Sequence, residues 1–274
     1  MNIKEKVGNV TNNLHHEIDD IKPTKRKWHL FLKLIPLLIF IAILKVLSHT
    51  YGFEVLSLNA LLTSLIAATT FLIGFLITGV ISDYKEAEKI PGELASSLAV
   101  LYDEAYIISK NKKSKISKEF IDFHSQFVNS LMDWFYKKEK TRNIMDKLNN
   151  MNDYFAKLEN LTQATFIARM KNEQNNIRKL IIRIHSIRET SFVQSAYAIV
   201  ESLAFFLVVA LLLLKLEPFY EALFFSLVVS FLVTYMIALI KDLDNPFEYS
   251  EYGEVRSEVS LKPLHDLRNR LSKN

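Results

Sequence analysis

Four segments of the chain are long and apolar enough to cross a membrane as helices. They cover residues 30–46, 55–82, 192–214 and 219–240. The second segment contains no charged side chain, and its roughly 28 residues would extend about 42 Å as a helix, longer than a hydrocarbon core of about 30 Å. The sequence therefore predicts four membrane-spanning helices, and the second is expected to continue past the bilayer.

The chain is poor in the residues that interrupt helices. Glycine and proline number only six each, and neither occurs between Glu93 and Glu217. No run of alternating Val, Ile or Thr residues indicates a strand. We therefore predict an all-α fold: a polytopic membrane protein with two transmembrane hairpins and a large helical cytosolic module.

Lysine and arginine residues orient the chain across the membrane. Residues 1–29 contain six of them, the 49–54 connection contains none, and Lys215 is the only one in the 215–218 connection. Because basic residues concentrate in cytoplasmic loops, both termini and the central region are expected to be cytoplasmic. The predicted location is a plasma membrane, crossed several times.

These boundaries divide the chain into five parts. The N-terminal part is expected to be an amphipathic helix that packs on a neighbouring subunit or lies along the membrane surface. The parts are 1–29, the N-terminal cytosolic helix; 30–82, the first transmembrane hairpin; 83–191, the cytosolic helical region; 192–240, the second hairpin; and 241–274, the cytosolic C-terminal segment.

Apolar side chains recur at helical spacing through the cytosolic region, which predicts core or subunit contacts. The basic tract 169–188 is expected to be a solvated helix face. The apolar positions are Phe120, Phe123, Phe127, Leu131, Trp134, Phe135, Phe155, Leu158, Phe166, Met170, Ile177, Leu180, Ile181 and Ile184.

A helical wheel divides the second membrane segment into two unlike faces. Small, hydroxylated and aromatic residues fall within about 40° of Phe75, and bulky aliphatic residues lie opposite. Either close helix packing through small residues or a pore-lining role would explain this division. The first face holds Ser64, Ala68, Phe71, Phe75, Gly79, Ser82 and Glu86, and the second holds Leu62, Ile66, Ile73, Ile77 and Val80.

Three short motifs resemble those of the bestrophin family. Gly74-Phe75 precedes the element Tyr84-Lys85-Glu86-Ala87, and residues 243–252, LDNPFEYSEY, resemble the family's D/N-P-F segment. The sequence Leu261-Lys262-Pro263-Leu264 is similar to a Pro-Leu element that follows it, and the order of hairpins and cytosolic helices also agrees. The chain resembles the bacterial branch more closely than the animal channels, and this resemblance implies a bacterial inner membrane.

The resemblance implies a homopentameric ion channel whose second helix lines the pore. Phe75 and Phe71 would form the neck, with the smaller Ala67 or Ala68 one turn further along. The pore-lining residues would be Ser64, Thr78, Gly79, Ser82 and Glu86. Bestrophins usually place Arg and Asn after the neck aromatic, but this chain has Leu76, Ile77 and Thr78, so ion preference is not transferable.

A neck of phenyl rings is expected to gate by dewetting, because an ion cannot shed its water without polar replacements. The charge of the permeant ion stays open, with anions such as chloride slightly favoured by the family. Phenyl edges favour anions, whereas a ring of Glu86 carboxylates would favour cations. Alternatively, Glu86 forms an intrahelical pair with Lys89.

Other charged residues within or next to the spans have alternative roles. Lys33 and Lys45 are expected to snorkel from the first span. Glu201 is expected to form hydrogen bonds between helices, and Glu221 to be solvated or paired with Lys215. The acidic tail could hold calcium, but a solvated turn around Pro246 is favoured; its acids are Asp242, Asp244, Glu248, Glu251 and Glu254.

No catalytic motif or cofactor motif is present, so an enzyme is not predicted. The chain has no cysteine, its histidines lack metal-ligand spacing, and its basic residues form no nucleic-acid stripe. The predicted partners are further copies of the chain, the lipid bilayer and small inorganic ions. The alternatives to a channel are a non-conducting scaffold or signalling protein and a triggered pore-forming effector.

Overall fold

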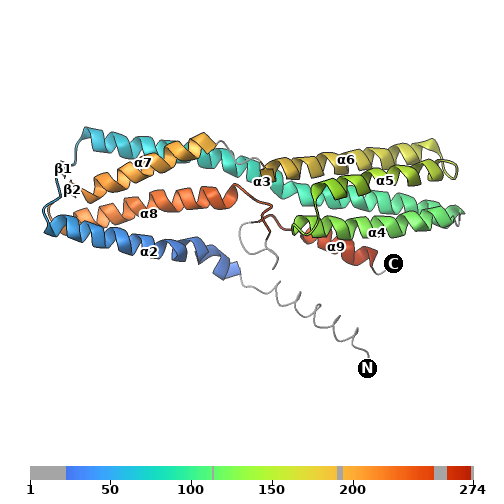
Figure 1. Ribbon diagram of the computed structural model, residues 1–274, viewed down its shortest axis with the longest axis horizontal. Helices are drawn as coiled ribbons and strands as arrows, with labels where there is room; N and C mark the ends of the chain where they lie inside the picture. Colours follow the sequence, from blue (N-terminus) through green and yellow to red (C-terminus); the bar gives the residue numbers. More distant parts are fainter. Residues whose placement is uncertain (1–22, 113, 190–193, 250–257, 273–274) are drawn as a thin grey trace, which may run out of the picture. The chain divides into compact units, whose positions relative to one another are not determined.

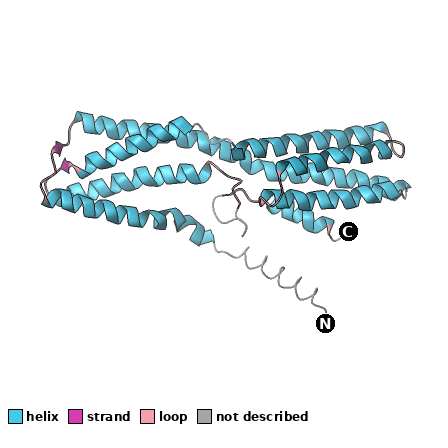
Figure 2. Cartoon of the chain, viewed as in Figure 1, coloured by secondary structure: helices cyan, strands magenta, loops and turns pink. Residues whose placement is uncertain are grey.

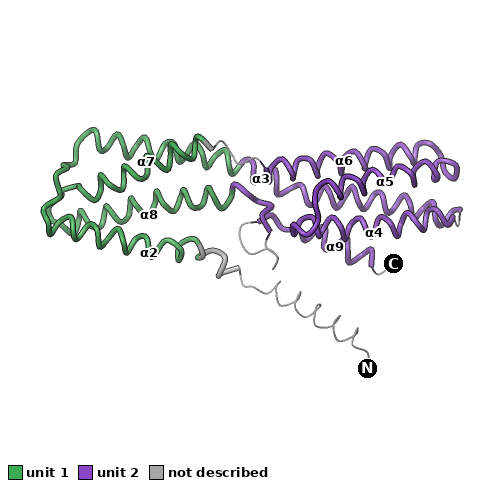
Figure 3. Tube along the Cα trace, viewed as in Figure 1, with its two compact units in different colours: residues 1–81, 192–243 green, residues 82–191, 244–274 purple. Residues whose placement is uncertain are grey.

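The structure is a computed structural model that describes residues 23–112, 114–189, 194–249 and 258–272. Almost all of these residues are helical, as Figure 2 shows, which confirms the predicted all-α fold. The chain divides into two compact units, coloured separately in Figure 3. Unit 1 comprises residues 1–81 and 192–243, and unit 2 comprises residues 82–191 and 244–274. The predicted N-terminal amphipathic helix lies mostly outside the described residues.

Unit 1 contains the apolar helices. Its elements are α2 (Pro23–Thr50), the first part of α3 (Ala60–Lys112), α7 (Gln194–Leu212) and α8 (Phe219–Leu243). Each helix has a segment long and apolar enough to cross a membrane. Helix α8 packs beside α2 (Figure 1), where the rings of Phe31 and Phe231 meet edge to face at 5.6 Å between centroids.

Helix α3 begins later than its apolar sequence predicts. Residues 55–59 are not helical, because Leu56–Ser57 form strand β1, which pairs in parallel with β2 (Leu214–Lys215). The side chain of Asn59 accepts a hydrogen bond of 2.9 Å from the backbone N–H of Leu62. This contact is an N-cap, which satisfies one of the free N–H groups of the first turn and sets where the helix starts.

Helix α3 also continues through Pro91 and Gly92, two residue types that usually interrupt helices. It runs without interruption to Lys112, for 53 residues, with Pro91 inside it. A proline within a helix removes one backbone hydrogen bond and costs about 3 kcal/mol. The neighbouring side chains of Ile90 and Leu94 are buried, at 4% and 0% exposure, and this burial offsets the loss.

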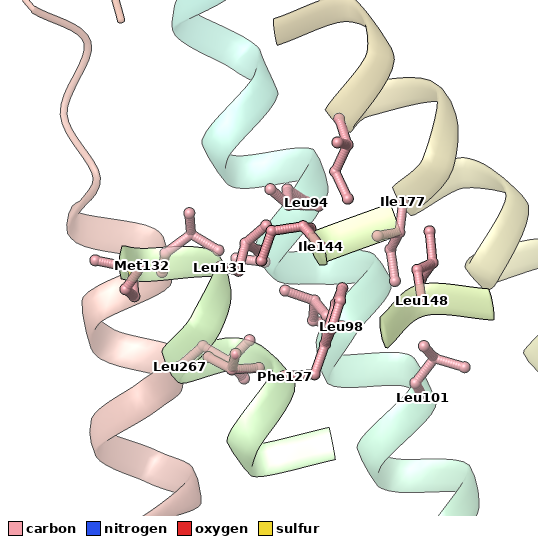
Figure 4. Close-up of a cluster of buried hydrophobic side chains, with 14 of the residues drawn as sticks. Leu94, Leu98, Leu101, Phe127, Leu131, Met132, Ile144, Leu148, Ile177 and Leu267 are labelled. Atoms are coloured by element: carbon pink, nitrogen blue, oxygen red, sulfur yellow. The ribbon is translucent and has the colours of Figure 1, made fainter. Parts of the chain in front are cut away.

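Unit 2 is a helical bundle around one apolar core. It contains the rest of α3 with α4 (Lys115–Phe135), α5 (Thr141–Glu159), α6 (Ala164–Glu189) and α9 (Lys262–Leu271). Figure 4 shows side chains from these helices converging, among them Leu98, Phe127, Leu148 and Ile177. The apolar stripes predicted from periodicity therefore supply most of the core. Phe123 and Leu180 are only partly buried against it, and Phe166 is half-buried outside this cluster.

The segment after α8 is anchored in the unit 2 core. Helix α8 ends at Leu243, as expected from Pro246 and its effect on the residue before it. Phe247 is fully buried, and the hydroxyl of Tyr249 donates a hydrogen bond of 2.6 Å to the carbonyl of Val259. The D-N-P-F motif thus contributes a packed aromatic anchor.

Candidate functional site on helix α3

The two predicted neck residues lie on an uncovered face of α3. Phe71 is 72% exposed and Phe75 is 68% exposed in the protomer. On the opposite face, Ile73, Leu76 and Val80 are at most 4% exposed and pack with residues of α7 and α8. The two faces predicted from the helical wheel therefore differ in burial as well as in composition.

The other predicted neck and lining residues share the uncovered face. All are exposed except Gly79, which is half-buried: Ser64, Ala67, Ala68, Thr78, Ser82 and Glu86. The hydroxyls of Ser64 and Thr78 donate to the carbonyls of Ala60 and Gly74, at 2.7 and 2.8 Å. Because their protons are used within the helix, these hydroxyls present oxygen lone pairs outward.

Glu86 has a partner that the sequence did not indicate. Its two carboxylate oxygens accept hydrogen bonds of 2.9 Å each from Nε and Nη2 of Arg183 on α6. This bidentate geometry gives the strongest form of an arginine–carboxylate pair. The hydrogen bonds to Glu86 raise the pKa of Arg183 above its ordinary value. Of the two roles considered for Glu86, the alternative of an intrahelical pair with Lys89 is therefore wrong, because Arg183 contacts both carboxylate oxygens.

Lys45 is buried by protein and does not snorkel as predicted. Its side chain has 0% exposure, and Nζ lies 2.7 Å from Glu54 and 2.5 Å from the carbonyl of Leu214. Burial alone would raise the pKa of Glu54, but hydrogen bonds from His49 and Lys45 outweigh that effect and lower it. Lys33 on the same helix is exposed, so snorkelling stays a prediction for this residue.

The two carboxylates expected within the spans have different surroundings. Glu201 lies 2.5 Å from Lys241, so it forms the contact between helices, α7 and α8, that was predicted. Glu221 is exposed at the start of α8, and Lys215 lies 3.6 Å from Glu217 instead.

The acidic tail forms ordinary polar contacts where it is described. Glu248 accepts hydrogen bonds from Lys137 and Asn245, at 3.3 and 3.4 Å. Within the described part of the chain, no three His, Cys, Asp or Glu side chains gather as metal ligands. Glu251 and Glu254 lie outside the described residues.

His124 in unit 2 is fully buried, and burial lowers its pKa to about 4, so it is a neutral core residue.

Arg183 is the residue of this region that sequence reasoning missed. It belongs to the basic tract that was expected to be a solvated face, and it is 97 positions from Glu86. No local pattern links residues so far apart. The signals available in the sequence were a carboxylate on α3 with two alternative roles and several arginines in the tract 169–188.

Comparisons with known proteins identify the family and the fold of the chain. The family model for the Bestrophin-like domain matches residues 30–249. A bacterial bestrophin homologue from Klebsiella pneumoniae superposes with a TM-score of 0.72 at 14% identity, over 89% of this chain and 97% of that chain. A variant of that homologue gives a TM-score of 0.73 at 15% identity, over 88% and 98%.

A further solved structure, described as a membrane protein, superposes with a TM-score of 0.74 at 14% identity and covers 88% of this chain and 97% of its own. No curated protein sequence matches the chain. At such low identity the structural likeness establishes a shared fold, whereas the family match extends over most of the sequence.

Proposed function

Because the chain belongs to the bestrophin-like family, as its motifs predicted, we propose that it forms an oligomeric ion channel. Several copies, five by resemblance to bestrophins, would surround one axis, and each would present the Phe75 face of α3 to it. The observation that carries the proposal is the exposure of Phe71 and Phe75 opposite a buried aliphatic face. An exposed face that met only lipid would not need small and hydroxylated residues such as Ser64, Thr78 and Ser82 beside the two phenyl groups.

The proposed neck consists of two apolar rings. Phe71 and Phe75 lie one helical turn apart, so several copies place two layers of phenyl groups around the axis. Such a constriction empties of water when narrow and then blocks ions. Ala67 and Ala68, about one turn before Phe71, have smaller side chains, so the proposed pore would be wider there. Opening requires the phenyl groups to rotate or the helices to separate.

The proposed permeant ion is an anion such as chloride. Phenyl edges carry positive partial charge and favour anions at the neck. Glu86 would oppose this preference as a free carboxylate, but its bidentate contact with Arg183 compensates its charge. In the proposed channel, the Glu86 side chains would therefore not form a ring of uncompensated negative charge.

The proposed orientation follows the basic residues. The Lys and Arg content of residues 1–29, and the charged region 83–191 between the hairpins, favour cytoplasmic termini and a cytoplasmic unit 2. For a bacterial chain this corresponds to the inner membrane. Helix α3 continues past residue 82 without interruption. In the proposed channel this continuation would extend the pore wall into a cytosolic vestibule. The proposal includes no catalytic step.

The test is a double truncation of the neck. Phe71→Ala/Phe75→Ala should keep the oligomeric size and increase ion flux through liposomes, because the widened neck stays wet. If the two rings were core residues, each truncation would cost about 3–5 kcal/mol and disperse the assembly. Liposome ion flux and size-exclusion chromatography, measured together, distinguish these outcomes.

A matched control uses two phenyl rings away from α3. Phe205 and Phe206 on α7 are 65% and 59% exposed, and their double alanine variant should leave the flux unchanged. If Phe71→Ala/Phe75→Ala keeps its oligomeric size and its ion flux is unchanged, the proposal that these residues form the gate is contradicted. A protein that never conducts would indicate a scaffold, and conduction only with an added trigger would indicate an effector.

A further inference from the structure

The contact between Glu86 and Arg183 joins α3 to α6 in unit 2. Both side chains remain half-exposed, at 54% for Glu86 and 46% for Arg183. A charge on either one therefore acts on nearby solvent and ions, but while the two are paired their charges largely cancel. Asp83, about one turn earlier on α3, also acts on Arg183 and contributes to its raised pKa.

Glu86 occupies a position that an ion in the proposed pore would pass. On the helical wheel it falls within about 40° of Phe75, and eleven residues of helix place it roughly 16 Å beyond the neck. The helix is uninterrupted between the two residues. In an oligomer, Glu86 would recur once per copy at this depth, and Arg183 would recur beside it.

We propose that Arg183 is a selectivity-determining residue, which neutralises Glu86 and so prevents a cation-selective acidic ring at this end of the pore. The inference rests on the proposed channel function and adds a second residue, from another helix, to the ion path. Removing Arg183 would leave one free carboxylate per copy. Removing Glu86 would leave one free guanidinium per copy, with the opposite effect on ions.

The expected size follows from Coulomb's law. One unit charge about 6 Å from an ion in water changes its local concentration by about threefold. Several copies act together, so the permeability ratio of cation to anion should change by about threefold or more. The shift should shrink at high salt, because added ions screen exposed charges.

The experiment measures reversal potentials in lipid bilayers under a potassium chloride gradient. Arg183→Gln should raise the ratio of cation to anion permeability, and Glu86→Gln should lower it. The double variant Arg183→Gln/Glu86→Gln should return toward the wild-type ratio. The conservative variant Arg183→Lys keeps the positive charge and should rescue most of the selectivity lost in Arg183→Gln.

A matched control lies in the same unit. Arg270 and Asp103 form an arginine–carboxylate contact of 2.8 Å between α9 and α3, with side chains 54% and 51% exposed. Asp103 falls about 80° away from Phe75 on the helical wheel. Arg270→Gln therefore removes the same kind of pair away from the proposed ion path and should leave the reversal potential unchanged.

The outcomes separate this inference from the channel proposal. Absence of ion flux from the wild-type protein would overturn both. Flux with one common reversal potential in all variants would overturn only the role of Arg183. If Arg183→Gln fails to assemble, Glu86→Gln still carries the test, and loss of assembly in both would make the pair structural and overturn the proposal.

Discussion

Lys45 and Lys33 lie on the same helix, α2, but only Lys45 is enclosed by protein. Its ammonium group contacts Glu54 and the carbonyl groups of Leu212 and Leu214, at 2.7, 3.4 and 2.5 Å. Glu54 belongs to the connection after α2, Leu212 ends α7, and Leu214 begins strand β2. Lys45 therefore joins the connection after α2 to the connection after α7, because it donates to groups that are otherwise buried there.

Lys45→Met should destabilise the protein strongly. The substitution keeps the length of the side chain but leaves the Glu54 carboxylate, whose side chain is 6% exposed, without its main cation. Removal of one partner from a buried pair costs on the order of 3 kcal/mol. Thermal unfolding in detergent should show a lower midpoint than for Lys33→Met, which alters an exposed lysine; equal midpoints would contradict a structural role for Lys45.

At the scale of single elements, the end of α4 depends on a side chain from α6. The guanidinium of Arg188 donates hydrogen bonds to the carbonyls of Trp134 and Phe135, at 3.3 and 3.0 Å. It also lies over the Trp134 ring, 4.6 Å from the centroid. Burial lowers its pKa to about 10, but it remains charged and stabilises the negative end of the helix.

Arg188→Ala should destabilise unit 2 by about 2–4 kcal/mol, because the last carbonyls of α4 lose charged donors and Trp134 loses a cation–π contact. Arg188→Lys should recover only part of this loss, since lysine lacks the planar fork. The measurement is the unfolding free energy in denaturant. Arg178→Ala, on the same helix, removes an exposed hydrogen bond to Asn149 and serves as the control; a loss as large as that of Arg188→Ala would argue against the α4 contact.

At the scale of the whole molecule, the face of α3 around Phe71 and Phe75 is left uncovered by the described residues of one protomer. Its exposed aromatic and hydroxylated side chains lie on the helix that the proposed pore uses, and the opposite face is already packed. If the proposed channel forms, neighbouring copies would surround this face, because the path for ions would lie between copies rather than within one four-helix unit.

The detergent-solubilised protein should therefore have a mass several times 31.7 kDa, with five copies expected. Light scattering on a purified sample measures this mass after correction for bound detergent, and a particle image along the symmetry axis would show the copies and the path between them. A monodisperse monomer would contradict the proposed pore, whereas a stable dimer would contradict only the subunit number and the axial arrangement of α3.

Much of the fold was predictable because it depends on local patterns. The apolar runs predicted four spans, and the stripe through Phe127 and Leu131 predicted the core of unit 2, since helical periodicity places such residues on one side. The separation of Phe75 from Ile73 and Val80 was predictable for the same reason. These features need only the spacing of side chains along one helix.

Tertiary contacts decided the remaining features. The partner of Glu86 is 97 residues away, and Lys45 is buried because the carbonyl of Leu214 lies beside it. Helix α3 starts at Ala60 because residues 56–57 pair with a distant strand. It passes through Pro91 because Ile90 and Leu94 are buried. In each case the free energy comes from groups that meet only after folding, which no local pattern in the sequence encodes.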